Sequence, residues 1–376
     1  MSERMHQKNK LIIKMKRYKF IYLIALMAAG FCSCRNQEVA EEYTIKMDEA
    51  EKTFKLADIL EPLKFTAIQS PDSCLMKNLD KVIQIPDGYV ILDRANEHSV
   101  VAYSEAGQFI CTFGRKGGGP GEYTFVHDIA LSPNRDSLLV CGDNSDVYIY
   151  SLDGVFGRKL QASEKVPLSH ITTNSDNIVM CASDIMKGFD QFYLYSPKMD
   201  IKFAGIPSSG HFTIPTCNEI WASNNSVYYL DWYANKLYEI NTADNHISKT
   251  WEFDIPNNVA SQNYSDMMSF LMNQREVGFI MNWAIGNDKF IGEYILDGEQ
   301  LIILYDLHAN SLVKQGKYND ILPDLFPAIA DNNFIAVINA DNYEIYKERL
   351  PQGVELPVLD DEKTDVILML WQLKTN

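Results

Sequence analysis

The stretch GRKGGGPGEY, residues 114–123, gathers side chains that could bind a charged ligand. Two basic residues stand before four glycines in five positions, and an acid and a tyrosine follow. Such a loop binds phosphate when its amides open a helix. Here Pro120 interrupts the glycines, and the next segment, TFVHDIAL, has a strand pattern, so the stretch is expected to be a turn. If the protein holds an anionic ligand, we expect it at Arg115, Lys116, Glu122 and Tyr123.

Two histidines, an aspartate and a tryptophan are the remaining candidates for ligand binding. His127 and Asp128 begin one apolar run, and His170 begins another. Each histidine has an alternative role as a structural hydrogen-bonding group. Trp283 offers a stacking surface for a sugar or peptide, or packs inside the fold. The sequence contains no GxSxG, HExxH, phosphate-loop or EF-hand pattern, so no catalytic residue is assigned.

The elements that position these residues repeat along the chain. Apolar strands ending in polar turns recur at Tyr103, Tyr150, Tyr195, Ile240, Tyr305 and Trp371, with spacings of 47, 45, 45, 65 and 66 residues. The first unit contains four strand-like runs, KVIQI, YVILD, SVVAY and QFICTF. Four strands in about 45 residues is the period of a propeller blade. The sequence therefore predicts an all-β, six-bladed β-propeller with four-stranded blades.

The sixth unit lacks its outermost strand. It offers FIAVI and VILMLWQL, and the sequence then ends at residue 376. An upstream segment, LKFTAI at 63–68, has strand character. We expect it to complete the sixth blade, because pairing of the chain ends protects an exposed sheet edge and closes the ring.

Three long connections are expected on one face of the ring. They are the glycine stretch, an insertion at 254–280 and an insertion at 339–364, and the two insertions contain the helix-like runs YSDMMSFLMNQREVG and NYEIYKERL. Insertions that collect on one face of a repeat protein indicate its binding face.

Five aspartates recur at the connections between the second and third strands of the first five blades. A calcium site is one interpretation, because Ca²⁺ takes several oxygen ligands. The other is that each aspartate caps its own turn. Near the channel, only Asp128 and Asn282 are candidate ligands, so no metal site is assigned. The recurring residues are Asp93, Asp143, Asp184, Asp231 and Asp297.

The segments DRANEHSVVAYSEAGQFI (93–110) and FGRKGGGPGEYTFVHDIAL (113–131) carry a family resemblance. They are similar to the NHL-repeat pattern, and the chain resembles six-bladed, TolB-like propeller lipoproteins of Gram-negative gut-type bacteria. The similarity is specific over about 50 residues of the first two blades. It implies a propeller fold, whereas function remains open, because one fold serves hydrolases, lyases, sensors and binding modules.

The N-terminal residues have the pattern of a secretory signal. Basic residues precede an apolar run at 20–29, and FCSC at 31–34 resembles a lipobox with Cys34 as the lipidated residue. The expected organisation is a signal peptide over 1–33, starting at Met1 or Met15, then a tether and lead-in over 34–60, and a propeller over 61–376. A plain cleaved signal or a short anchor is the alternative. Arg35 after the cysteine favours the outer membrane, with the lipid anchor as the only membrane contact.

The charge of the mature chain limits its partners. Removing residues 1–33 takes away seven of 34 basic and one of 50 acidic residues, which leaves a formal charge of −22. This charge argues against nucleic acid, since binding its phosphates needs a basic surface. The five cysteines of the body show no CxxC spacing and are expected to be buried thiols, with one disulfide as the alternative; they are Cys74, Cys111, Cys141, Cys181 and Cys217.

Two classes of function follow. The first is an envelope module that binds a glycan, a peptide or a protein partner on the insertion-bearing face, without a cofactor. The second is a metal-dependent hydrolase or lyase of the gluconolactonase-like type at the channel mouth, with Ca²⁺ as the ion. Converging carboxylates would favour the second class, and an aromatic channel mouth the first.

Overall fold

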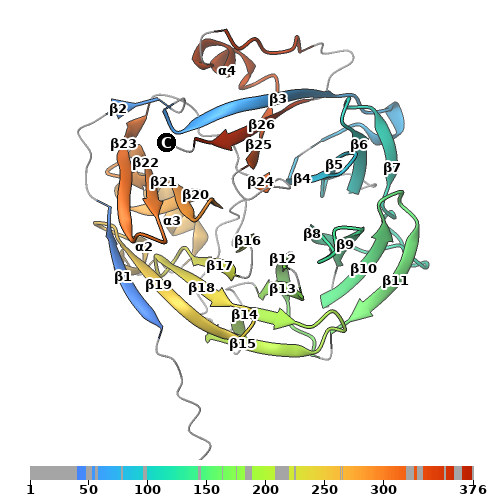
Figure 1. Ribbon diagram of the computed structural model, residues 1–376, viewed down its shortest axis with the longest axis horizontal. Helices are drawn as coiled ribbons and strands as arrows, with labels where there is room; N and C mark the ends of the chain where they lie inside the picture. The colour runs from blue at the N-terminus through green and yellow to red at the C-terminus, as the bar shows by residue number, and fades with distance from the viewer. Residues whose placement is uncertain are drawn as a thin grey trace, which may run out of the picture. The chain divides into compact units, whose positions relative to one another are not determined.

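Six β-sheets surround a common centre within residues 41–376 (Figure 1). The computed structural model describes residues 40–47, 53–55, 58–77, 79–95, 100–142, 145–162, 164–174, 176–182, 189–207, 220–223, 226–262, 264, 266–318, 326–327, 333–350, 353–359 and 366–374. Each sheet contains four antiparallel strands, and two of the sheets have a fifth, parallel strand at their outer edge. This arrangement confirms the six-bladed propeller that the repeat predicts.

Blades 1 to 3 are each a consecutive segment of chain that runs from the centre outward. Blade 1 contains β4 (Lys81–Ile85), β5 (Gly88–Leu92), β6 (Val100–Ser104) and β7 (Phe109–Thr112). Blade 2 contains β8 (Val126–Leu131), β9 (Ser137–Gly142), β10 (Asp146–Ser151) and β11 (Phe156–Gln161). Blade 3 contains β12 (Leu168–Asn174), β13 (Asn177–Ala182), β14 (Asp190–Tyr195) and β15 (Ile201–Pro207).

Blades 4 and 5 each gain a fifth strand from the N-terminal segment. Blade 4 contains β16 (Ile220–Ser223), β17 (Ser226–Asp231), β18 (Lys236–Asn241) and β19 (His246–Asp254). Blade 5 contains β20 (Phe279–Gly286), β21 (Lys289–Leu296), β22 (Glu299–Asp306) and β23 (Ser311–Tyr318). Outside them, β1 (Glu41–Lys46) pairs in parallel with β19, and β2 (Thr53–Phe54) pairs in parallel with β23. The expected lead-in over 34–60 therefore contains two strands of the ring.

Blade 6 is completed from both ends of the chain. It contains β24 (Phe326–Pro327), β25 (Asn333–Ile338), β26 (Val366–Leu373) and, outermost, β3 (Leu60–Ile68). The antiparallel register pairs Thr66 with Leu368 and Leu60 with Leu373. The predicted closure by 63–68 is thus confirmed. Gly107 lies at the seam with blade 1, where a side chain would collide with the carbonyl of Ala67.

The hydrophobic core lies mainly between the blades. Separate clusters of buried side chains fill the interfaces of blades 1 and 2, 2 and 3, 3 and 4, and 6 and 1, and a larger cluster joins blades 4, 5 and 6. Both faces of a middle strand are buried, as in β5, where all five residues are buried. Near-continuous apolar runs such as GYVIL therefore form strands here.

The helices fall within the connections. The link from β19 to β20 holds α2 (Val259–Gln262), α3 (Met267–Asn273) and the 3₁₀ turn η4 (Gln274–Glu276), and the Asp266 side chain caps α3. The link from β25 to β26 holds α4 (Tyr343–Arg349), and η2 (Asp72–Cys74) follows β3. In the described part of the chain, no helix combines the length and apolar character needed to cross a membrane.

Neighbouring strands of a blade are antiparallel, so successive links alternate between the two faces of the ring. The links from the second to the third strand of a blade therefore lie on the same face as the links from one blade to the next. We call this end the insertion face. It carries the glycine stretch between β7 and β8 and the links that contain α2, α3 and α4.

Candidate functional site

The glycine stretch forms a compact hairpin-like loop on the insertion face. The Gly117 amide donates to the Tyr123 carbonyl at 3.0 Å, and the Tyr123 amide donates to the Arg115 carbonyl at 3.1 Å. Gly114 and Gly121 have φ of 70° and 73°, which favours glycine over other residues. The segment that follows is strand β8, so the loop is the interblade turn that the sequence predicts.

The loop has its own anion. The Glu122 carboxylate accepts hydrogen bonds from the Gly119 amide at 2.8 Å and from Arg115 Nε at 2.7 Å. A Cβ at Gly117 would collide with this carboxylate, so a larger residue there would force the Glu122 side chain to move. The Gly119 amide and the Arg115 guanidinium hold the pKa of Glu122 below its ordinary value. The position that a bound anion would take is therefore occupied by Glu122.

A surface pocket of about 390 Å³ lies between this loop and the outer strands of blade 2. Lys159 on β11 forms an ion pair with Asp146 on β10 at 2.5 Å, and this bond raises the pKa of Lys159. The Lys159 ammonium also lies 5.2 Å from the centre of the Tyr148 ring. The lining residues are Gly117, Gly118, Gly119, Pro120, Gly121, Glu122, Thr124, Asp146, Tyr148, Phe156 and Lys159.

Two residues of the predicted site lie in the core instead of on the surface. Tyr123 has no exposed surface, and its hydroxyl donates to the Phe113 carbonyl at 3.0 Å. Trp283 is 2% exposed on β20 and stacks on Phe290 with ring centres 6.0 Å apart. Their rings pack between blades, which is the alternative that the sequence left open for Trp283.

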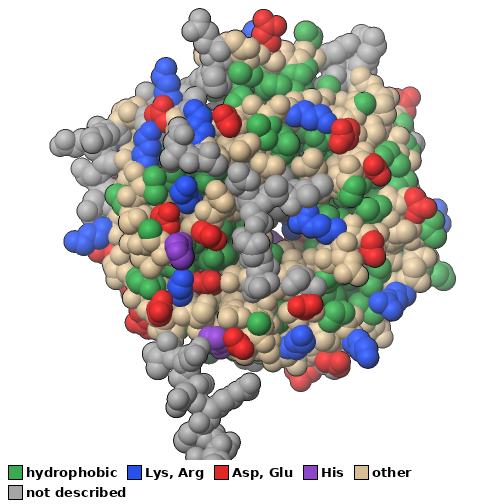
Figure 2. Space-filling model, viewed as in Figure 1, with side chains coloured by type: hydrophobic (Ala, Val, Ile, Leu, Met, Phe, Trp, Pro, Cys, Tyr) green, Lys and Arg blue, Asp and Glu red, His purple; other side chains and the backbone are tan. Residues whose placement is uncertain are grey.

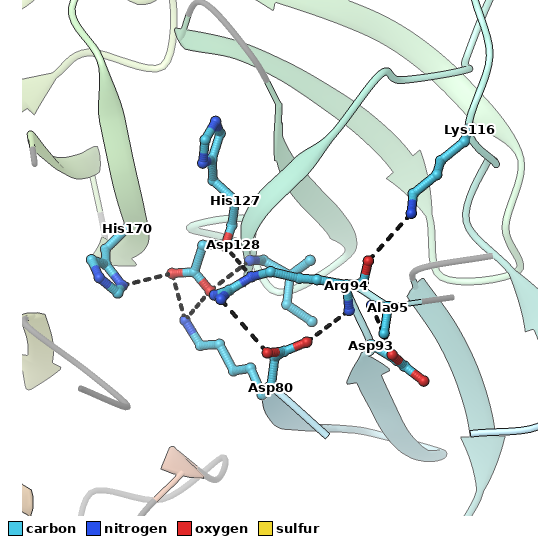
Figure 3. Close-up of polar contacts among 10 residues, drawn as sticks. Asp80, Asp93, Arg94, Ala95, Lys116, His127, Asp128 and His170 are labelled. Atoms are coloured by element: carbon cyan, nitrogen blue, oxygen red, sulfur yellow. Dashed lines mark hydrogen bonds and ion pairs between the residues drawn. The ribbon is translucent and has the colours of Figure 1, made fainter. Parts of the chain in front are cut away.

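A second polar cluster joins the innermost strands of blades 1, 2 and 3 near the insertion face (Figure 3). Asp128, 1% exposed on β8, accepts from Lys81 Nζ at 2.9 Å. It also accepts from the amides of Ile129 at 2.8 Å and Ile171 at 2.9 Å. Asp128 therefore holds its own strand, the strand of blade 1 and the strand of blade 3 together.

His170 lies beside this carboxylate, with Nδ1 3.8 Å from Asp128 Oδ2 (Figure 3). Burial lowers the pKa of His170 to about 4, although the Asp128 charge opposes the shift. The imidazole is neutral at pH 7. At that pH the cluster holds an ion pair and an uncharged ring.

Arg94 links this cluster to the glycine loop (Figure 3). Its Nε donates to the His127 carbonyl at 3.0 Å, and its Nη1 lies 3.6 Å from Asp80 Oδ1. Lys116 Nζ donates to the Arg94 carbonyl at 3.3 Å. The His127 ring packs edge-on against Phe125, with ring centres 5.0 Å apart.

The structure thus brings together Lys116, His127, Asp128 and His170, and it separates them from Trp283 in blade 5. Sequence reasoning missed the residues that complete both sites. The sequence signals that could have identified some of them are charged residues within strand-like runs: Lys81 in KVIQI, Asp146 in DVYIY and Lys159 in FGRKLQ. The missed residues are Lys81, Arg94, Asp146, Tyr148 and Lys159.

Two of the recurring aspartates, Asp93 and Asp231, act as turn caps, and Asp297 has a left-handed backbone conformation with φ of 50°. Asp93 accepts from the amides of Lys77 at 2.7 Å and Ala95 at 3.0 Å, and Asp231 accepts from the Ala234 amide at 2.9 Å. Asp143, Asp184 and Cys34 lie outside the described residues. Within the described ranges, no three His, Cys, Asp or Glu side chains gather to hold a metal ion.

The described cysteines are consistent with a packing role. Cys74 and Cys141 are buried, and burial raises the pKa of the half-buried Cys111 thiol to about 11. Cys217 and the side chain of Cys181 lie outside what the structure describes.

The ring defines the chain as a six-bladed β-propeller, and comparison with known proteins places it in a family. The family described as "Domain of unknown function (DUF4934)" matches residues 42–368, and the chain belongs to it. No curated protein matches the chain.

Solved structures also align with this chain. A "putative exported protein (BF0058)" from Bacteroides fragilis aligns with a TM-score of 0.65 and 18% identity, over 90% of this chain and all of that one. The WD40 propeller domain of Doa1 aligns with a TM-score of 0.44 and 10% identity, over 84% of this chain and 98% of that one.

Proposed function

We propose that this chain is an envelope-anchored binding protein that holds a ligand on the insertion face. The pocket beside the glycine loop is the observation that carries the proposal. It measures about 390 Å³, which lies in the range of small-ligand sites, and it combines aromatic side chains with a few polar groups. The ligand is a glycan, a peptide or a segment of a protein partner.

The state of the inner cluster supports binding over hydrolysis. Asp128 is the acid nearest the channel that the sequence offers for catalysis, yet Lys81 and two backbone amides already bind it. A general base or metal ligand needs free lone pairs directed at a substrate. The contacts of Asp128 instead hold three blades in register.

The charge pattern also points to local recognition. Figure 2 shows acidic and basic side chains interspersed over the face in view, with neither sign gathered into one field. Long-range steering needs a surface dominated by one sign. Selection of the ligand therefore falls to the contacts inside the pocket.

Export and lipid anchoring belong to the same proposal. The basic and apolar segments before FCSC at 31–34 support a signal whose processed Cys34 carries the lipid. The description of the Bacteroides fragilis protein as exported agrees with this location. We also place the chain among lipoprotein propellers of the NHL-like and TolB-like kind, on the resemblance of blades 1 and 2.

A thermal-shift panel on residues 35–376 tests the binding role. Neutral and acidic oligosaccharides, short peptides and CaCl₂ are added separately, because a ligand that binds only the folded state raises the melting temperature. Saturable stabilisation by a sugar or peptide is expected. Stabilisation by calcium alone would contradict the proposal and favour a metal-dependent enzyme.

Metabolic labelling with a fatty acid tests the anchor. The full-length chain is expected to incorporate label and to fractionate with the outer membrane, and Cys34→Ala is expected to lose the label. Cys32→Ala, which alters the neighbouring cysteine of the signal, is the matched control. Equal labelling of the wild type and Cys34→Ala would contradict lipidation at this residue.

A further inference from the structure

The charges around the pocket disfavour an anionic ligand. The Gly119 amide and Arg115, which would hold an anion, already bind Glu122. Glu122 and Asp146 both line the pocket, and Lys159 is the one cation among its described lining residues. A ligand carboxylate or phosphate would therefore lie close to two like charges.

The polar groups of the pocket are suited to bind two adjacent hydroxyl groups of a ligand. The Asp146 and Lys159 side chains retain 15% and 35% of their exposure, although they bond to each other. A carboxylate has about four acceptor sites and an ammonium three donors, so each group retains capacity. An acceptor beside a donor suits two adjacent hydroxyls, since each hydroxyl both donates and accepts. The Thr124 hydroxyl adds a third group of this kind.

The apolar part of the pocket is small and aromatic. Phe156 and Tyr148 line it from adjacent strands of blade 2. Aromatic carbon can pack against the C–H groups of a sugar ring while polar groups bond its hydroxyls. Apart from Pro120, these two rings are the main apolar groups of the pocket, so most of its lining is polar or backbone and suits a polar ligand.

Given the proposed binding role, we infer that this pocket recognises an uncharged saccharide unit. Asp146 and Lys159 bond two neighbouring hydroxyls of the sugar, and Phe156 and Tyr148 contact its C–H groups. Glu122 fixes the loop on the opposite wall and keeps acidic sugars out.

The test is a binding titration on residues 35–376, read by saturation-transfer NMR and calorimetry. The probes are glucose, galactose, mannose, xylose, rhamnose and N-acetylglucosamine with their disaccharides, glucuronate and galacturonate as charged counterparts, and trialanine. We expect at least one neutral sugar to saturate. We expect it to bind at least about tenfold more tightly than its uronate, because the uronate meets Glu122 and Asp146.

Two neighbouring residues of β11 give a matched pair of variants. Lys159→Met keeps the length of the side chain but removes the donor, so affinity is expected to fall at least about tenfold. Arg158→Met changes the adjacent cation, which lines a separate pocket, and is expected to leave affinity unchanged. Thr124→Val, with an expected loss of about threefold, tests the site independently if Lys159→Met does not fold.

Each remaining outcome of the titration overturns either the saccharide inference or the assignment of the site to this pocket. Binding of trialanine but of no sugar, lost in Lys159→Met, overturns the saccharide inference and leaves the binding function standing. Tighter binding of a uronate than of its neutral counterpart also overturns the inference. Sugar binding that neither Lys159→Met nor Thr124→Val weakens overturns this pocket as the site. Failure of every sugar overturns the saccharide inference, and the thermal-shift panel described above then decides separately whether the proposed binding function stands.

Discussion

The Glu122 carboxylate accepts a hydrogen bond from the Gly119 amide, 2.8 Å away, within the loop to which both residues belong. The loop is therefore a preformed anion site that its own side chain fills. The glycine-rich sequence resembles a phosphate loop, but the Gly119 amide and Arg115 Nε already bind the Glu122 carboxylate of the same loop.

Removing this side chain should open the site. Glu122→Ala removes the acceptor that the Gly119 amide and Arg115 Nε now bind, so we expect the variant to bind sulfate at least about tenfold more tightly than the wild type at pH 7. Shifts of the Gly118 and Gly119 amide signals during a sulfate titration measure the effect. Glu105→Ala, which removes an exposed carboxylate paired with Lys64, is the control. Equal sulfate affinity in the wild type and Glu122→Ala would show that Glu122 does not block the anion site of the glycine loop.

The buried ion pair should be important for stability. Lys81→Met leaves the 1% exposed Asp128 without its cation, and loss of one partner from a buried pair costs about 3–5 kcal/mol of unfolding free energy. Urea unfolding measures the loss. Lys64→Met breaks the exposed pair with Glu105 and should cost less than about 1 kcal/mol. Similar losses in both variants would contradict a stabilising role for the interblade contact.

His170 should make stability depend on pH. Its pKa is about 4 in the folded chain and 6.5 when exposed, so the unfolded state takes up a proton first as the pH falls. Stability is full above pH 6.5 and declines toward pH 4, with a loss of about 2 kcal/mol between pH 7.5 and 5.

His170→Asn should lack this part of the decline, because the other titrating groups are common to both proteins. Urea unfolding of the two proteins at pH 7.5 and 5 isolates the histidine. Parallel pH dependence in both proteins would refute a neutral His170 with a lowered pKa.

Ring closure by β3 should be more important than the two added strands. A chain that starts at residue 58 loses β1 and β2 but keeps β3, whereas a chain that starts at residue 70 also loses β3. We expect the first to fold with reduced stability and the second to lack a cooperative unfolding transition, because blade 6 is then three-stranded and the ring is open. Circular dichroism during thermal unfolding distinguishes them. A cooperative transition in the shorter chain would contradict closure by β3.

The repeat pattern predicted the fold because each blade contains its own periodic signal. The spacing from Tyr103 to Trp371 set the number of blades, and the missing strand after Leu373 located β3. The strands β1 and β2 were not predicted, since they add to finished blades and interrupt no repeat. The short alternating run of β1, EEYTIK, carries no mark of its partner strand β19.

The site was less predictable because its contacts cross between blades. Asp128 was recognised, but its partner Lys81 lies 47 positions earlier on another sheet. The bond between the Glu122 carboxylate and the Gly119 amide depends on the conformation of the glycine loop, and the burial of Tyr123 depends on the blade packed against it. Residue type alone could not separate a surface tyrosine from a core tyrosine.

The N-terminal strands impose an order on the folding of the chain. β1, β2 and β3 are synthesised first, yet each pairs with a strand more than 200 residues later. Such distant pairings are slow, because a long loop must close before the contact forms. During synthesis, β3 remains without its partner strand until Val366–Leu373 has been made. The ring is therefore completed only when synthesis of the chain is nearly finished, and the unpaired edge of β3 is the segment that a chaperone would need to protect.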